Sequence, residues 1–142
     1  MIEVIHDNER ENRNIKEFSE IAVRQLNFSV DRVIISFVDT KTIGDNPRSD
    51  KRTLGSLLLL PDCYKVDIDK DIPSSVQALT ICHELIHVNQ NVLGRLAPVV
   101  DGWTWDGEYY ATTSNYSERP WEIEARAKER DLLYSVLKEY RS

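Results

Sequence analysis

Residues 74–93 read SSVQALTICHELIHVNQNVL, and this stretch decides the fold. Neither Gly nor Pro interrupts it, Pro73 precedes it and Gly94 follows it, so it predicts a helix. Ser74 and Gln77 have the spacing of a capping box in its first turn. Two faces of this helix are apolar, and the third carries Thr80, His83, His87, Gln90 and Asn91. A helix with this pattern is buried on two sides and presents its histidines to a cleft.

Residues 83–87 of this segment form the motif His-Glu-Leu-Ile-His. Residues four apart lie one above the other on a helix, so the imidazoles of His83 and His87 can bind one zinc ion together. Glu84 is turned by about 100° from His83, so its carboxylate can reach a zinc-bound water without ligating the metal. This is the arrangement of a zinc hydrolase. The alternative is a pair of core histidines that hydrogen-bond to backbone carbonyl groups.

The chain has 142 residues and a net charge of −6, with 41% hydrophobic and 30% charged residues. This predicts one globular domain over residues 1–142. Lys and Arg are scattered along the chain, which argues against nucleic acid as a partner. The longest apolar run, residues 57–60, is too short to cross a membrane, and the N-terminus lacks the apolar segment of a signal peptide. Two cysteines make no disulfide framework, so we expect a cytoplasmic protein with no membrane partner; the oligomeric state is not predicted.

The rest of the chain contains one further long helical pattern before the motif and one after it. We expect an amphipathic helix over residues 9–27, strands over 32–38, 54–60 and 64–69, and a loop over 40–51. Asp106-Gly107 within the aromatic stretch 103–110 predicts a hairpin, although a long loop would fit the same residues. Pro120 opens a last helix that ends near Tyr140. This order predicts an α+β domain with a small mixed sheet around the central helix of residues 74–93.

A catalytic zinc ion needs a third protein ligand. His6 and Cys63 are candidates, but we expect an exposed histidine and a buried thiol at these positions. Glu122 is the stronger candidate, because it falls on the apolar face of the last helix beside Trp121 and Ala125. A carboxylate on such a face needs a partner, and a zinc ion is a suitable one.

The last helix carries two other carboxylates that could take the place of Glu122. Glu129 falls on the same apolar face, so it remains a candidate. Glu124 falls among charged residues, where we expect it to face water and its removal to cost less than about 0.5 kcal/mol. An ion pair of Glu122 with Arg126, one turn later, is the structural alternative to a zinc ligand.

The motif at residues 83–87, followed by a helical Glu-x-x-Ala at residues 122–125, resembles the gluzincin branch of the zincin metallopeptidases. The resemblance covers roughly residues 54–137 and implies a zincin-like fold with one Zn²⁺ per chain. It implies His83, His87 and Glu122 as ligands and Glu84 as general base. Many gluzincins carry Asp or Asn where this chain has Arg126, so the residue that supports a ligand histidine is unassigned. The small domain with HELIHVNQ and RPWEIEA is also similar to zincin-like proteins of bacteriophages.

We therefore expect a zinc-dependent metallopeptidase that acts on a peptide or protein substrate. Glu84 would take a proton from the zinc-bound water and pass it to the leaving amine. The hydroxyl of Tyr109, Tyr110 or Tyr116 could stabilise the oxyanion, although packing is the commoner role of a tyrosine. The strand at residues 54–60 could pair with an extended substrate, whereas its leucines favour burial in the sheet.

Two other functions fit the same residues. One is a catalytically weak or inactive zincin-like module with a structural or binding role, for example in a bacteriophage. The small size and the lack of a second substrate-binding lobe favour it, while Glu84 argues against it, because a structural zinc site needs no base. The other is a zinc hydrolase that cleaves a non-peptide amide.

Overall fold

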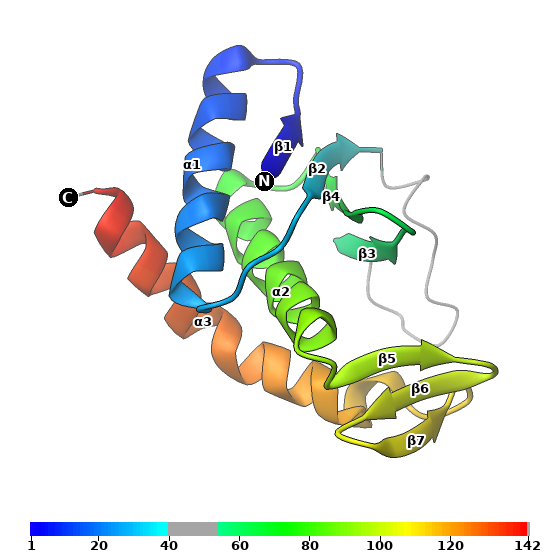
Figure 1. The fold of residues 1–142 in the computed structure, drawn as a ribbon. Coiled ribbons are helices and arrows are strands. Elements are labelled where there is room, and N and C mark those ends of the chain that lie inside the picture. The colour runs from blue at the N-terminus through cyan, green and yellow to red at the C-terminus, as the bar shows by residue number, and fades with distance from the viewer. Residues whose placement is uncertain (40–53, 142) are drawn as a thin grey trace.

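The structure is a computed structural model, and it describes residues 1–39 and 54–141. In chain order its elements are β1 (Ile2–Ile5), α1 (Glu9–Gln25), β2 (Val33–Val38), β3 (Gly55–Leu59), β4 (Tyr64–Asp69), α2 (Ser74–Val92), β5 (Leu96–Val99), β6 (Gly102–Trp105), β7 (Glu108–Ala111), the 3-10 helix η2 (Tyr116–Glu118) and α3 (Pro120–Tyr140) (Figure 1). The predicted α+β class is confirmed. The loop predicted over residues 40–51 lies outside the described residues.

The first sheet has the strand order β1-β2-β4-β3. Strands β1, β2 and β4 are parallel, and β3 runs antiparallel to β4 at one edge. Alternate side chains of a strand point to the same face, and here that face is apolar. Val33 and Ile35 of β2 and Val66 and Ile68 of β4 are completely buried. This face of the sheet forms one side of the main core.

Helix α2 lies at the centre of the domain, between the first sheet and α3 (Figure 1). Its apolar faces supply the middle of the core through Ile81, Cys82, Leu85, Ile86 and Val88. The other two helices add one apolar stripe each: Phe18, Ile21 and Ala22 from α1, and Ala125, Leu132 and Val136 from α3. The three helices therefore share one core.

A second sheet, with the order β5-β6-β7, lies beyond the C-terminal end of α2 (Figure 1). The hairpin predicted from Asp106-Gly107 is present, and both residues have the positive φ of a type I′ turn, 48° and 88°. Leu96 and Trp105 of this sheet pack against Trp121 in the first turn of α3. The second sheet therefore holds the start of α3 against the end of α2.

The predicted C-terminal end of α2 is confirmed, and the predicted N-terminal cap is wrong. Gly94 adopts φ 75° after the last helical turn, as predicted, and Arg95 N–H donates to Gln90 O at 3.0 Å. The predicted capping box is wrong, because Pro73 occupies the N-cap position and no side chain caps the helix. The amide of Gln77 instead donates to Asp69 O at the end of β4.

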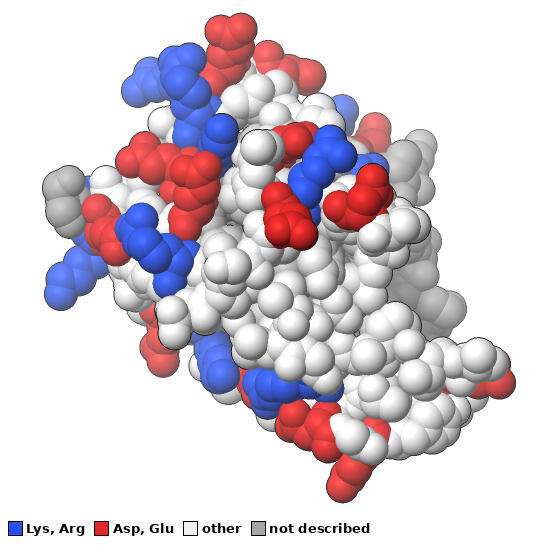
Figure 2. Space-filling model, viewed as in Figure 1, with Lys and Arg blue, Asp and Glu red and all other residues white. Residues whose placement is uncertain are grey.

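On the face of the molecule in Figure 2, cationic and anionic side chains are interspersed, and a broad area toward β5–β7 is largely uncharged. No continuous basic surface forms on the face shown there. Among the helices of the described residues, none combines the length and the apolar character needed to cross a membrane.

Candidate metal centre

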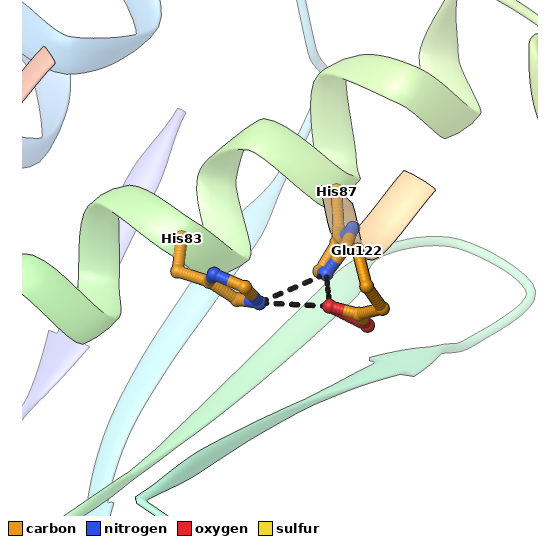
Figure 3. Close-up of side chains that lie close together, drawn as sticks. All are labelled: His83, His87 and Glu122. Atoms are coloured by element: carbon orange, nitrogen blue, oxygen red, sulfur yellow. Dashed lines mark hydrogen bonds and ion pairs between the residues drawn. The ribbon is translucent and has the colours of Figure 1, made fainter. Parts of the chain in front are cut away.

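Three side chains from α2 and α3 converge on one point (Figure 3). The Nε2 atoms of His83 and His87 lie 3.1 Å apart. One oxygen of Glu122, Oε1, lies 3.0 Å from Nε2 of His83 and 2.9 Å from Nε2 of His87. The structure therefore brings together the three residues that the sequence proposed as ligands.

The size of this triangle fits a metal ion. Zinc bonds of about 2.0–2.1 Å in tetrahedral geometry separate neighbouring ligand atoms by about 3.3 Å. The separations of 2.9–3.1 Å therefore need to widen only by a few tenths of an ångström. Two imidazole nitrogens and a carboxylate oxygen suit zinc better than calcium or magnesium, which prefer oxygen ligands. Within the described residues, this is the group of histidine, cysteine and acidic side chains that is close enough to hold a metal ion.

The outer nitrogen of each imidazole is also held. Nδ1 of His83 lies 2.7 Å from Glu129 Oε2, and Nδ1 of His87 lies 2.7 Å from Gln90 Oε1. Both partners are acceptors, so each Nδ1 carries the proton and donates it. In the neutral imidazole this leaves the lone pair on Nε2, the atom that points into the triangle.

Glu129 is the carboxylate that contacts the outer nitrogen of His83, a partner that the sequence left unassigned. The position that holds Asp or Asn in many gluzincins is Arg126 here, and its guanidinium donates to Ser117 O at 2.7 Å. Glu129 reaches His83 from one turn further along α3. The sequence placed Glu129 on the buried face of the last helix but did not identify the imidazole that it contacts. Gln90 as the partner of His87 was missed, although it lies on the polar stripe of α2.

Charge in the centre favours a cation. Burial opposes an ionised Glu122, but its hydrogen bonds with His83 and His87 outweigh burial and hold the pKa of this carboxyl well below its usual range. Burial likewise opposes a charged His83, yet hydrogen bonds with Glu122 and Glu129 raise its pKa to about 10. Burial opposes a charged His87 as well, but its hydrogen bond with Glu122 and the charge of that carboxylate raise its pKa. The carboxylates around the two imidazoles therefore favour positive charge at this point.

Glu84 is buried at the same centre without belonging to the triangle. Only 7% of the residue is exposed, and burial raises the pKa of its carboxyl, while the nearby His87 and His83 partly oppose this. A carboxyl with a raised pKa holds a proton more readily than an ordinary glutamate, as a general base must. The role of Glu84 as a base stays a prediction from the sequence.

One of the three candidate tyrosines reaches the centre. Burial of the Tyr116 hydroxyl and the negative charge of the neighbouring Glu122 raise the pKa of this tyrosine. Tyr109 instead donates to Asp101 O at 3.0 Å, and the ring of Tyr110 packs edge-on against Trp121. Tyr116 is therefore the tyrosine that could contact a substrate bound at the triangle.

The other candidate ligands lie outside the group. The expectation that His6 is exposed is wrong: it is half-buried and accepts a hydrogen bond from Asn8 N–H at 3.0 Å. Cys63 is a buried free thiol, as expected. The expectation that Glu124 faces water is wrong. Its carboxylate binds Arg95 through two bonds of 2.9 and 2.7 Å and accepts from Gln90 Nε2 at 3.2 Å. The periodicity of α3 alone could not predict these contacts, because Gln90 lies on α2 and Arg95 follows it.

No family model, no curated protein and no solved structure matches this chain. The function is therefore inferred from the motif and from the geometry around it.

Proposed function

We propose that the protein is a zinc-dependent metallopeptidase. The observation that carries the proposal is the triangle of His83 Nε2, His87 Nε2 and Glu122 Oε1, with sides of 2.9–3.1 Å, beside the buried carboxylate of Glu84. A purely structural metal site has no use for a buried base next to the ligands. The resemblance to gluzincins rests on the same four residues.

The chain's own residues divide the reaction between them. Zinc, when bound, supplies Lewis acidity that makes water acidic enough to lose a proton near neutral pH. Glu84 accepts that proton and donates it to the amine that leaves when the peptide bond breaks. Tyr116 donates a hydrogen bond to the carbonyl oxygen as negative charge develops on it. Glu129 and Gln90 keep both imidazoles in the tautomer that presents Nε2 to the metal.

The edge strand β3 offers a path for an extended substrate. A Cβ atom placed on Gly55 would lie 2.6 Å from Thr80 Cγ2, so the start of β3 packs directly on α2 one turn before the motif. At the other end of the motif, the Tyr64 hydroxyl donates to Asn91 Oδ1 at 2.6 Å, and Tyr64 is the partner of Leu59 in the sheet. Strand β3 therefore runs beside α2 along the whole motif.

Thr80 and Asn91 mark the side of α2 that faces β3, and Glu84 falls between them on the same side at helical spacing. A peptide that pairs with β3 would thus pass the base and the metal ligands. A hollow of about 420 Å³ at the far end of β3, lined in part by Leu59, Tyr64 and Asn91, gives such a chain room to continue. The leucines of β3 do not prevent this, because Leu58 is exposed, Leu57 and Leu59 are half-buried, and the outer edge of β3 is unpaired within the described strands.

The test compares wild type and Glu84→Gln on an unbiased peptide library in the presence of zinc. Gln has nearly the shape of Glu but cannot accept the proton, so we expect both proteins to bind zinc and only wild type to cleave, with a loss of about 10²-fold or more. Equal cleavage by both proteins would refute the mechanism. Zinc binding with no cleavage by either protein would instead support the binding-module alternative.

A further inference from the structure

Gln90 is a completely buried polar residue in contact with a proposed ligand. Its side-chain oxygen accepts from His87 Nδ1 at 2.7 Å. Its side-chain nitrogen donates to Trp121 O at 3.1 Å and to Glu124 Oε1 at 3.2 Å. The amide thus uses its acceptor and both of its donor hydrogens, although no water reaches it.

The orientation of this amide is decided by its neighbours. The carbonyl of Trp121 and the carboxylate of Glu124 are both acceptors, so the NH₂ group has to face them. The oxygen then has to face His87, which must donate from Nδ1. A flipped amide would set its oxygen against two other acceptors and leave His87 without one, and a buried polar group without a partner costs about 1–3 kcal/mol.

Glu124 is itself held by the segment that follows α2. The Arg95 guanidinium binds it through two bonds and also donates to Asp106 Oδ1 at 3.2 Å in the turn of the β6–β7 hairpin. The same guanidinium lies 4.4 Å from the centre of the Trp105 ring. Backbone and side chain act together here, because Arg95 N–H also donates to the carbonyl of Gln90.

We infer that Gln90, Glu124 and Arg95 form a positioning network that fixes the tautomer and orientation of His87 and connects the metal centre to the β5–β7 sheet. The inference rests on the proposed metal site. His83 donates to the carboxylate of Glu129, whereas His87 donates to the neutral side-chain amide of Gln90. The orientation of that amide depends on Glu124, which is paired with Arg95. These are positioning residues, since each acts on the metal through His87.

The test measures zinc affinity by chelator competition in wild type, Gln90→Leu, Glu124→Gln and Glu3→Gln. Glu3 is the matched control, because it also forms two bonds with one arginine, Arg32, at 3.0 and 3.1 Å. We expect Gln90→Leu to weaken zinc binding by about 10–100-fold, Glu124→Gln by about 3–10-fold, and Glu3→Gln by less than about twofold.

A second readout separates positioning from a general loss of stability. In the zinc-loaded protein, the NMR signal of the His87 Nδ1 proton should be protected from exchange in wild type, exchange faster in Glu124→Gln and be lost in Gln90→Leu. Glu124→Gln alone decides the question if Gln90→Leu does not fold. Folded variants with wild-type zinc affinity and a protected proton would overturn the network. A wild-type protein that binds no zinc would overturn the proposed function together with it.

Discussion

The thermal stability of the protein should depend on zinc through His83. Free zinc at about 100 times its Kd stabilises a folded protein by about 2.7 kcal/mol. An unfolding entropy of about 2.1 cal/mol/K per residue gives about 0.3 kcal/mol/K for 142 residues. We therefore expect zinc to raise the Tm of wild type by about 9 °C over the protein in EDTA.

The change to make is His83→Ala, which removes one corner of the triangle. An affinity loss of about 100-fold or more brings Kd up to the zinc concentration used, and the shift in Tm falls to about 1–2 °C. Glu84→Gln is the matched control, since it alters the neighbouring buried residue without removing a ligand, and it should keep the shift of about 9 °C. Scanning calorimetry with and without zinc measures both. A full shift in His83→Ala would refute the triangle as the zinc site, and loss of the shift in Glu84→Gln would make Glu84 a ligand rather than a base.

Three further outcomes follow from the structure. Glu122→Ala should abolish tight zinc binding, whereas Glu124→Ala should bind zinc more weakly than wild type; equilibrium dialysis measures both. Glu124→Ala should also lower the free energy of unfolding in EDTA by about 1–2 kcal/mol, measured by urea unfolding, because its ion pair with Arg95 is partly exposed and its hydrogen bond from Gln90 is buried. In the metal-free protein the pKa of His83 is raised from 6.5 to about 10, so its contribution to stability is complete below pH 6.5 and is lost as the pH rises toward 10. Zinc must displace that proton, so the zinc-dependent rise in Tm should be larger at pH 8 than at pH 6.5, and a rise independent of pH would contradict this. Gly94→Ala should lower the free energy of unfolding by about 1–2 kcal/mol through its φ of 75° alone, because the added Cβ would meet no atom within 4 Å; an unchanged urea midpoint would count against this reason.

The parts of the site that could be predicted are those set by one helix. Once residues 74–93 form a helix, the spacing of His83 and His87 places both on one face, with Glu84 turned by about 100° from His83. Glu122 was found in the same way, since a carboxylate on an apolar helical face must be buried and needs a partner. Periodicity over about twenty residues is a strong signal, which is why α2 and α3 were predicted with their ends almost correct.

The strands that were missed are short and depend on their neighbours. β1 has four residues and is ordered by its parallel pairing with β2, in which Ile2 lies opposite Val33. β5 contains Pro98, which argues against a strand in any sequence pattern. It is tolerated because β5 lies at the edge of the second sheet.

The contacts around the ligands could not be predicted, because they join residues distant in sequence. Glu129 meets His83 across 46 positions and Arg95 meets Glu124 across 29. A helical wheel describes how one helix is turned, but not which side chain of another segment arrives at its flank. That is why Glu124, which falls among charged residues of its own helix, was expected to face water.

The charges at the centre give a reason for an amide, rather than a carboxylate, at position 90. Three carboxyl groups, those of Glu84, Glu122 and Glu129, already lie around the two histidines. A glutamate at position 90 would add a fourth carboxyl group and set it against Glu124. Gln90 supplies the acceptor that His87 needs without adding charge, and Arg95 neutralises Glu124 behind it. Asp106 in the β6–β7 turn holds Arg95 in place. The second sheet therefore contributes to the electrostatics of the site, although none of the proposed ligands lies on its strands.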